Sequence, residues 1–406
     1  MAENLYTIGN PPAGIYSGDI NVGYAFYHVL LDVHARDIKS RRGLDVRCPR
    51  YSLNVFGKKA ESLSDAKDDN DFKNEIDNYV NSWIDLNRSR DRLNLSFQGT
   101  IIDNSSESVD EAQRTFVKLQ ERGYLINRDR SYFLDLEKIA KEIDLKQGLD
   151  RLNFYPSRSK GEFLRFILEN TSSPLALTKS TRYSAKNPFN GENLGPLFVS
   201  STIWESYFDQ ELNTLAIGEK GMLRYAFLRF IIRMATDGTP KNKNIFCFNR
   251  IDPEDGYEEW NLEYLTRDPF ETDILRYSLI KSHSSNLQKT FLRKSLLKGG
   301  KKFVYLIGNI SKYFAQRRKV NKTEIFSETS FDSEYVSAMD EFRFGDAINR
   351  LELELNDISQ NINTAKSSQS DPYLDYLYIR YLKILKKLEP FVPIISKSSA
   401  DRIGEK

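Results

Sequence analysis

The fold class follows from residues 14–46, GIYSGDINVGYAFYHVLLDVHARDIKSRRGLDV. Their apolar residues recur at helical spacing, which predicts a helix over 22–42 with Gly43 at the C-terminal cap. A short apolar strand is expected before this helix, at residues 5–9, and another strand opens at Val46. Strand, glycine-bearing turn, helix and strand are the start of a doubly wound α/β sheet, whose ligands lie at the C-terminal ends of the strands.

The composition is that of an ordinary globular protein of two or three domains. The chain has 406 residues, 40% of them hydrophobic and 29% charged, with 59 basic and 57 acidic side chains. This near balance gives no case for nucleic-acid binding by the whole surface, so such a surface would have to be a local patch. Cys48 and Cys247 are the only cysteines, which excludes a disulfide framework and a knuckle of four cysteines for zinc. We expect no signal peptide, no membrane segment and no metal, and predict a cytoplasmic protein.

Helical periodicity continues along the chain. Amphipathic helices are predicted over 109–123, 157–170 and 222–236. Ser157 is expected to be an N-cap, and the polar, acidic residues 65–78 are interpreted as a loop or a solvated face. From about residue 273 the sequence predicts an all-α bundle, with helices over 273–281, 290–314, 333–361 and 372–388.

Several motifs, in this order, resemble methionyl-tRNA synthetases, which are class I aminoacyl-tRNA synthetases. Residues 14–46 are similar to the family's opening, where a proline-glycine turn leads to the His-Ile-Gly-His signature, a helix and Arg-Gly-Tyr/Leu-Asp-Val. LFVSSTIWESYF (197–208) falls on the family's Tyr-Val-Trp-Phe-Asp-Ala segment, and residues 217–240 resemble its Gly-Lys-Asp-Ile-x-Arg-Phe-His helix. DILRYSL (273–279) and LIGNISKYF (306–314) resemble the junction to the family's anticodon-binding bundle.

The resemblance implies an α/β fold, a Rossmann-like class I catalytic core with an inserted connective segment, followed by an all-α bundle like the anticodon-binding domain. The implied domains are the first half of the core, the insertion, the second half of the core, the bundle and a flexible tail, at residues 1–92, 93–178, 179–272, 273–396 and 397–406. The family's insertion usually carries zinc knuckles, for which this chain lacks the cysteines. We therefore expect apolar packing to hold the insertion, through Phe116, Leu119, Phe133 and Leu134.

The sequence departs from the family at both ATP signatures. The two signature histidines, which hold ATP phosphates in the family, fall on Asn21 and Tyr24, with Gly23 kept between them. Asn21 carries no charge, and Tyr24 is bulky enough to enter the space of a phosphate. The family's lysine loop falls on residues 252–256, DPEDG, whose acids would repel triphosphate. We expect neither ATP nor another cofactor, and no ATP-dependent activation of methionine.

The family's amino-acid pocket is altered as well. Its Trp and His fall on Ser200 and Ala226, and the acid of its Asp-Glu-His-Gly segment falls on Asn54. Small residues in place of Trp and His predict a wider pocket that gives a methionine side chain few contacts. The resemblance places the pocket at Ile15, Ser200, Thr202, Ile203, Tyr207 and Ala226, of which Tyr207 keeps its residue type.

A serine, three histidines and two arginines could have chemical roles, and each of them could also have a purely structural role. Ser17, on the turn after the first strand, is a candidate nucleophile by analogy with cyclodipeptide synthases, although turn serines are mostly turn formers. His28 and His34 lack the spacing of a helical metal site, and we interpret both, with His283, as structural. Arg229 and Arg233 share a helix face and could bind an anion, but pairing with acidic side chains is the favoured interpretation.

The best nucleic-acid candidate is a basic stretch in the bundle. Lysines and arginines alternate there with aromatic residues over 298–319, and the alternative interpretation is a solvated helix face. Within this stretch we predict tRNA-binding residues at Lys301, Lys302, Arg317 and Arg318.

Two classes of function therefore remain open. The first is a methionyl-tRNA-synthetase-like paralogue that has lost methionine activation and binds tRNA, a small amino-acid-like ligand or a protein partner. The second is a repurposed aminoacyl transferase or amino-acid ligase of specialised metabolism, which would take an already activated group. The sequence names neither the ligand nor the oligomeric state nor the pathway.

Overall fold

The computed structural model describes residues 5–11, 13–14, 22–49, 51–56, 61–65, 68–90, 92–97, 99–179, 181, 183–208, 211–218, 223–249, 251–254, 262–283, 290–316, 330–368 and 371–404. Their contacts divide the chain into two compact units. The first unit comprises Met1–Asp19, Asp45–Arg90 and Phe97–Phe248, and the second comprises Ile20–Leu44, Asp91–Ser96 and Asn249–Lys406. The first helix thus belongs to the second unit, whereas the predicted boundaries group residues 1–92 in the core.

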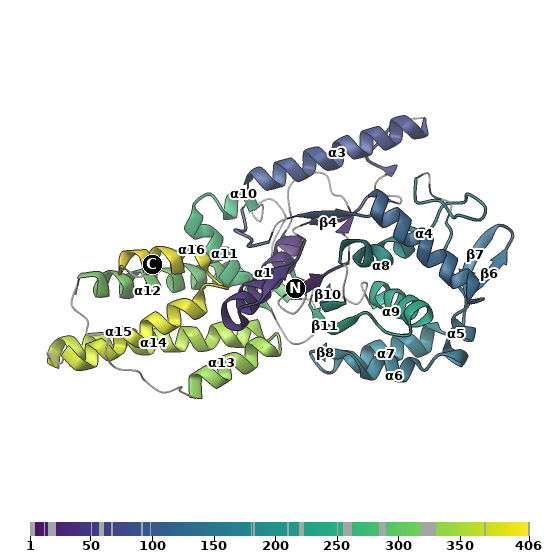
Figure 1. Cartoon of the computed structure of the whole chain (residues 1–406). Helices are drawn as coiled ribbons and strands as arrows, with labels where there is room; N and C mark the ends of the chain where they lie inside the picture. Colours follow the sequence, from purple (N-terminus) through teal and green to yellow (C-terminus); the bar gives the residue numbers. More distant parts are fainter. Residues whose placement is uncertain are drawn as a thin grey trace. The chain divides into compact units, whose positions relative to one another are not determined.

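A parallel five-stranded sheet forms the centre of the first unit (Figure 1). Its spatial order is β3-β1-β10-β11-β8, and every neighbouring pair is parallel. The order reverses between β1 and β10, which makes their C-terminal ends the switch point where sheets of this kind bind ligands. The strands are β1 (Leu5–Gly9), β3 (Asp45–Arg47), β8 (Asn153–Tyr155), β10 (Leu212–Gly218) and β11 (Asn242–Phe248).

Two smaller sheets complete the strands of the first unit. One is parallel and consists of β2 (Ala13–Gly14), β4 (Tyr51–Asn54) and β5 (Thr100–Ile102). The other is antiparallel and consists of β6 (Leu125–Arg128), β7 (Ser131–Leu134) and β9 (Leu175–Ala176). Around this second sheet the expected apolar packing is present, since Phe116, Leu119 and Leu134 are 0% exposed and Phe133 is half-buried.

Seven helices with known bounds pack in the described part of the first unit: α3 (Asp69–Arg90), α4 (Ser106–Glu121), α5 (Leu136–Glu142), α6 (Leu145–Asp150), α7 (Ser159–Asn170), α8 (Pro196–Tyr207) and α9 (Leu223–Asp237). Of the two interpretations of residues 65–78, a loop or a solvated face, helix α3 supports the solvated face from Asp69 onward. It buries Phe72, Ile76 and Val80, which lie four residues apart on one face among many acidic and amide side chains. Ser157 is not an N-cap, because α7 starts after Arg158, and that residue caps without a side-chain hydrogen bond.

The second unit is largely helical, as the sequence predicts. Helices α14 and α15 run side by side in Figure 1, and α12 packs on α11 and α16. Its elements are α1 (Val22–Arg42), β12 (Ile251–Pro253), α10 (Leu262–Leu265), α11 (Pro269–Ser282), β13 (Thr290–Leu292), α12 (Lys294–Gln316), α13 (Ser330–Asp340), α14 (Phe344–Ser368), α15 (Asp371–Leu388) and α16 (Pro393–Arg402). Helix α1 has the predicted bounds, and Gly43 follows it with φ +64°, a conformation that favours glycine.

Three boundaries in the second unit differ from the sequence prediction. Residues 290–292 form a strand that pairs with β12, so the predicted helix over 290–314 begins only at Lys294. The predicted helix over 333–361 is two helices, because Phe342 adopts φ 56° and breaks the helical path. The end of the chain, predicted to be flexible from residue 397, is helical up to Arg402.

A buried arginine ties the parts of the second unit together. Arg276 on α11 is 0% exposed and pairs with Asp32 of α1 at 2.8 Å. Its guanidinium also donates to the carbonyls of Leu93, Pro390 and Phe391 at 3.0, 2.7 and 2.9 Å. Because a buried guanidinium must satisfy its donors, this residue fixes the turn between α15 and α16 against α1 and α11.

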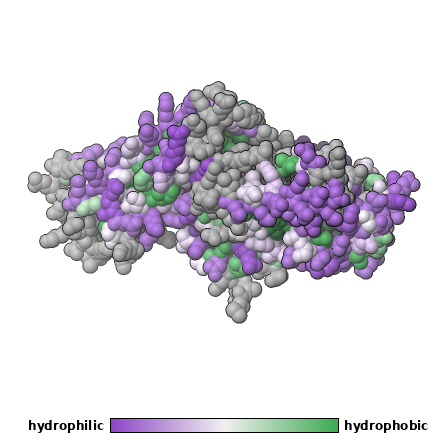
Figure 2. Space-filling view, turned by 90° about the horizontal axis from the view of Figure 1, so that it is seen from above, coloured by the Kyte–Doolittle hydropathy of each residue, from purple (hydrophilic) through white to green (hydrophobic). Residues whose placement is uncertain are grey.

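The surface shows no broad apolar face in the view of Figure 2, where hydrophilic side chains dominate and apolar ones form small separate patches. The exposed large apolar residues are correspondingly scattered, among them Leu168, Leu353 and Phe189. No helix in the described ranges combines the length and the apolar character that a membrane crossing requires.

Candidate functional site

A buried polar network lies at the C-terminal ends of the parallel strands β4 and β5. Asn54 is the last residue of β4 and Asp103 follows β5, so the parallel pairing brings both side chains to the same edge. The Asn54 amide donates to the Ser200 hydroxyl at 2.7 Å, and this hydroxyl donates to an Asp103 carboxylate oxygen at 3.3 Å. The Val55 N–H donates to the other carboxylate oxygen at 2.9 Å. Helix α8 thereby joins the edge of this sheet through Ser200.

Asp103 is the titratable group of this network. It is 0% exposed, and burial raises its pKa to about 7 against the opposing effect of the hydrogen bonds from Val55 and Ser200. The carboxyl group therefore changes protonation near neutral pH. Asp103 is not among the predicted site residues, although an acid directly after the short β-branched run 100–102 is the signal that could have identified it.

The predicted pocket residues lie on two packed helices, α8 and α9. Ser200, Thr202 and Ile203 on α8 and Ala226 on α9 are all buried, and Tyr207 on α8 is half-buried. Ser200 reaches the polar network, whereas the Thr202 hydroxyl donates back to the Val199 carbonyl within its own helix. Ile15, the sixth predicted position, lies outside the described residues.

Tyr207 is the one predicted pocket residue that keeps a partly accessible ring. The Arg47 guanidinium lies 5.8 Å from the centroid of this ring, within the range of a cation–π contact. Burial raises the pKa of Tyr207 above its ordinary value, and the nearby Arg47 opposes this effect. The phenol therefore stays neutral at physiological pH and can act as a hydrogen-bond donor.

A buried tryptophan lies on α8 among the predicted pocket residues. Trp204 is 1% exposed, and a side chain at Gly9 would approach its indole to 3.0 Å, so the ring lies at the C-terminal end of β1. The Trp204 indole N–H donates to the Tyr225 hydroxyl at 2.8 Å, which donates to the Ser200 carbonyl at 3.0 Å. Trp204 lies one helical turn after Ser200, and Ser200 and Ala226 are each 2% exposed. The predicted width of the pocket stays a prediction.

The structure describes two of the three residues at the first ATP signature, Gly23 and Tyr24. Asn21 and the candidate nucleophile Ser17 lie outside the described residues, while Gly23 and Tyr24 form the first turn of α1. The Tyr24 ring stacks on His28, with centroids 3.9 Å apart. His28 Nδ1 in turn contacts the Tyr24 carbonyl at 2.9 Å, which gives this histidine a role within its own helix.

The segment at the family's lysine loop is partly a strand. Asp252 and Pro253 belong to β12 and pair with β13, so the described part of this segment begins as a strand. The Glu254 carboxylate faces the Arg293 guanidinium at 3.5 Å. The described part of this segment therefore carries acids and no lysine, and its last two residues lie outside the described ranges.

Arg229 and Arg233 on α9 confirm the favoured structural interpretation. Both are 1% exposed, and both bind the Glu205 carboxylate, at 2.6 and 2.8 Å. Arg233 also pairs with Glu111 and Asp237, each at 3.4 Å. A guanidinium that is buried and already paired with carboxylates is not available to an external anion.

Two histidines and the two cysteines are buried or half-buried. Burial lowers the pKa of His34 to about 3 and that of His283 to about 4, so both are neutral at physiological pH. Burial raises the pKa of the Cys247 thiol to about 12, which makes it an inert thiol, and Cys48 is buried too. Across the described residues no group of three His, Cys, Asp or Glu side chains converges as metal ligands would.

The exposed face of α12 carries a row of positive charges. The helix carries five lysines, all exposed, and no acidic residue. Its apolar face, with Phe303, Ile307 and Phe314, is buried in the bundle, while Tyr305 is 61% exposed. The residues that form the α12 face recur three or four apart and are exposed. They are Lys294, Lys298, Lys301, Lys302, Tyr305, Asn309 and Lys312.

This α12 face contains two of the predicted tRNA-binding residues, Lys301 and Lys302. Arg317 and Arg318 follow the end of α12 and lie outside the described residues. The exposure of the two lysines agrees with the prediction, and tRNA binding itself stays a prediction.

Known proteins with a similar fold were found among solved structures. No protein-family model matches the chain, and no curated protein matches its sequence. The structure of Mycobacterium tuberculosis methionyl-tRNA synthetase bound by methionyl-adenylate is similar with a TM-score of 0.76 and 14% identity, over 98% of this chain and 93% of that one. The fold is that of a class I aminoacyl-tRNA synthetase.

Two further structures of the mycobacterial methionyl-tRNA synthetase are similar to this chain over nearly its whole length. Another complex with methionyl-adenylate gives a TM-score of 0.72 at 14% identity, over 99% of this chain and 94% of that one. The apo form gives 0.73 at 13% identity, over 99% and 92% of the two chains. Sequence identity of 13–14% shows that the fold is shared and says nothing about activity. The activity of this chain therefore depends on its own side chains.

Proposed function

We propose that this chain binds tRNA through the α12 face and does not form methionyl-adenylate. The observation that carries the proposal is the row of exposed lysines on α12, with Tyr305 among them and no acid on the helix. Lysines neutralise phosphates, and an exposed aromatic ring stacks on unpaired bases. The likeness of the fold to methionyl-tRNA synthetase supports tRNA as the kind of RNA.

The α12 face is held on a rigid support. A side chain at Gly300 would lie 2.8 Å from the Ile274 carbonyl, so this glycine allows α12 to approach α11 closely. The buried Phe303, Ile307 and Ile310 anchor the opposite face of the helix. The firmly packed helix fixes the backbone positions of the lysines, so binding to phosphates has to order only their side chains.

The loss of adenylate formation is supported by the described residues at the family's functional positions. Asn54 stands in place of an acid and is bonded to Ser200, and Trp204 occupies space at the end of β1. The described part of the lysine-loop segment carries Asp252 and Glu254 instead of lysines. Without positioned cations, the negative charge that develops on the triphosphate in the transition state is not stabilised.

Fluorescence anisotropy with a labelled methionine tRNA transcript, over a series of salt concentrations, tests the RNA proposal. The quadruple variant Lys298→Ala, Lys301→Ala, Lys302→Ala and Lys312→Ala should bind at least about tenfold more weakly, which is roughly 1.4 kcal/mol. Its salt dependence should be flatter, by roughly 0.9 log units per log of salt for each duplex phosphate that the variant leaves without a lysine. Equal affinity and equal slope for wild type and variant would contradict the proposal.

A matched control removes the same charge elsewhere. Lys118, Lys141, Lys146 and Lys186 are exposed lysines of the first unit, and changing all four to Ala should leave tRNA affinity close to that of the wild type. If the control weakens binding as much as the α12 variant, the attraction comes from overall charge and not from the α12 face.

Methionine-dependent exchange of pyrophosphate into ATP tests the second half of the proposal. We expect no exchange above background, because each missing transition-state donor lowers the rate by a factor of roughly 10² to 10³. A rate like that of an ordinary synthetase would show that the chain activates methionine, whatever its affinity for tRNA.

A second candidate function, aminoacyl transfer from an already charged tRNA, is favoured by one observation. The hydrogen-bonded Asn54, Ser200 and Asp103 keep polar groups at a strand edge, with a carboxyl whose pKa lies near neutral pH. If this candidate holds, the wild type should remove the aminoacyl group from charged tRNA, and Ser200→Ala should not. If neither protein changes the rate of deacylation, the network is structural.

A further inference from the structure

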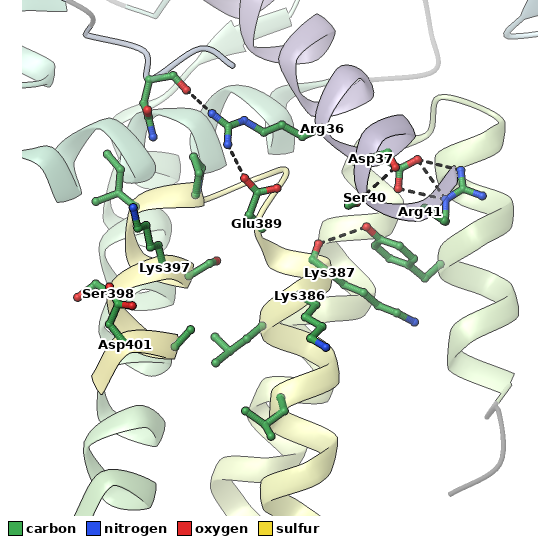
Figure 3. Close-up of a pocket in the computed structure, with 18 of the residues that line it drawn as sticks. Arg36, Asp37, Ser40, Arg41, Lys386, Lys387, Glu389, Lys397, Ser398 and Asp401 are labelled. Carbon is green, nitrogen blue, oxygen red and sulfur yellow. Dashed lines mark hydrogen bonds and ion pairs between the residues drawn. The ribbon is translucent and has the colours of Figure 1, made fainter. Parts of the chain in front are cut away.

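A large cavity lies within the second unit and is not part of the α12 face. Its volume is about 1220 Å³, and none of the residues that line it belongs to α12. Helices α1, α13, α15 and α16 form its walls, together with Asn94 (Figure 3). Small-molecule sites usually occupy about 300 to 1,000 Å³, so the cavity has room for an organic ligand and some water.

Apolar side chains make up much of the cavity wall. Val336 comes from α13, Leu382 and Leu385 from α15, and Pro393 and Ile394 from α16. Such a wall favours the apolar body of a ligand, because contact with it removes apolar surface from water on both sides.

The acidic groups of α1 and of the α15–α16 turn that line the cavity are neutralised by arginines. Arg36 on α1 binds the Glu389 carboxylate, as Figure 3 shows, and also Asp32 at 2.8 Å. Arg41, further along α1, binds Asp37 at 2.8 Å and Asp340 at 2.5 Å. These ion pairs leave little negative charge to repel an anion from this side of the cavity.

Two lysines give the cavity positive charge. Lys386 on α15 and Lys397 on α16 are exposed, and neither forms an ion pair with a described residue. Figure 3 shows them on different helices at the cavity. The third lining lysine, Lys387, is paired with Asp332, and Asp401 is the one lining acid without an ion pair among the described residues. The charges left after pairing are therefore two positive and one negative.

A buried hydroxyl adds a specific polar group. Ser396 on α16 lines the cavity, is 3% exposed, and its hydroxyl has no hydrogen-bond partner among the described residues. The cavity thus combines an apolar wall, two available cations and one unsatisfied polar group.

We propose that this cavity binds an amphiphilic organic anion, a ligand with an apolar body and a single carboxylate, sulfonate or phosphate group. The apolar body would lie on Leu382, Leu385 and Ile394, and the anionic group would meet Lys386 and Lys397. This site is independent of tRNA binding, because it uses no residue of the α12 face.

Titration of the full chain with 1-anilinonaphthalene-8-sulfonate, an apolar anion whose fluorescence rises on binding, tests the proposal. We expect one saturable site. Dodecanoate should displace the probe, and dodecyltrimethylammonium, which has a similar apolar body and the opposite charge, should not. Equal displacement by both competitors would overturn the proposal, because the site would then recognise only the apolar body.

Two kinds of variant locate the site. The double variant Lys386→Glu and Lys397→Glu reverses exposed charges and should weaken probe binding at least about tenfold, whereas the matched double reversal Lys298→Glu and Lys301→Glu on α12 should not. Ala400→Trp, at a half-buried position that lines the cavity, should weaken binding without a change of charge. Unchanged affinity in both the cavity double variant and Ala400→Trp would overturn the assignment.

The same variants separate this proposal from the proposed function. Lys386→Glu with Lys397→Glu should keep the tRNA affinity of the wild type, which also shows that the variant is folded, and the α12 reversal should lose tRNA and keep the probe. Sedimentation with phosphatidylglycerol vesicles, against phosphatidylcholine vesicles, identifies the source of the anion. Retention that depends on Lys386 and Lys397 indicates an acidic lipid, and probe binding without retention indicates a freely diffusing anion.

Discussion

Helices α9 and α12 both carry rows of basic residues, and the two rows have opposite surroundings. On α9, Arg229 and Arg233 are 1% exposed and bind Glu205, so their charges are neutralised inside the first unit. On α12, Lys298, Lys301 and Lys302 are exposed and lie on a helix without acids. The same spacing of positive charge therefore stabilises a core in one helix and remains exposed to solvent in the other.

This contrast shows how to interpret basic helices in a chain of nearly neutral net charge. A basic side chain is structural where an acid on a neighbouring element binds it. Glu205 on α8 binds Arg229 of α9 in this way. Arginine suits the buried role because its planar group bonds two carboxylate oxygens at once, and Arg229 does so here. Lysine, a strongly hydrated charge on a flexible stem, suits the exposed role of α12.

Breaking the α9 pairing should have the strongest effect on stability. Glu205→Gln should lower the free energy of unfolding by about 3 to 5 kcal/mol, because two buried guanidinium groups lose their shared carboxylate. Urea unfolding followed by circular dichroism measures this loss. The matched change Glu137→Gln, in the exposed ion pair with Lys141, should have no measurable effect, and equal stability of the two variants would contradict the comparison.

A smaller effect is expected from the packing that holds α12 in place. Gly300→Ala should cost about 1 to 3 kcal/mol, because the new methyl group meets the Ile274 carbonyl at 2.8 Å. Gly308→Ala on the same helix meets nothing within 4 Å and should stabilise the protein by about 0.5 to 1 kcal/mol. Thermal unfolding should shift in opposite directions, and a shift in the same direction would show that α12 is not held closely against α11.

The buried Asp103 should make the protein less stable as the pH rises toward 7. Burial raises the pKa of Asp103 to about 7, so between about pH 4 and 7 the folded state holds more protons than the unfolded state. The contribution of Asp103 to stability is therefore present at low pH and is lost as the pH rises through 7. One such carboxyl contributes a slope of up to about 1.4 kcal/mol per pH unit.

The variant Asp103→Asn removes this group and keeps its size. Urea midpoints measured between pH 4.5 and 7.5 should fall less steeply with pH in the variant than in the wild type. The exposed Asp150→Asn serves as the control and should follow the wild-type curve. Identical curves for Asp103→Asn and wild type would show that this carboxyl is ionised throughout the range.

The weakest effect on stability is the most informative about α12. Changing Lys298, Lys301, Lys302 and Lys312 to Ala should alter the free energy of unfolding by no more than about 0.5 kcal/mol per residue, because none is buried. The measurement is the urea midpoint of the same quadruple variant that is tested for tRNA binding. A loss of several kcal/mol would make these lysines part of the fold and weaken the case for a binding face.

Sequence patterns predict the long amphipathic elements well and the short or disguised elements poorly. Helix α1 has the predicted bounds, because apolar spacing and a terminal glycine mark both of its ends. The first part of helix α3, up to Asn78, is predicted only as a loop or a solvated face, since acidic and amide residues outnumber the few apolar ones that the helix buries. The strand β13 is predicted to be helical because three residues are too few to show a period, and only its pairing with β12 reveals the strand.

Helix α1, the helical character of the second unit and the class I synthetase fold follow from the amino-acid sequence alone. So does the positive charge on one face of α12, because a helical period converts residue spacing into direction. Other features emerge only when the chain is folded: Glu205 neutralises α9, Trp204 packs at the end of β1, and Ser200 links Asn54 to Asp103. These contacts join residues far apart in the sequence, and their energies depend on burial and distance, which no local pattern records.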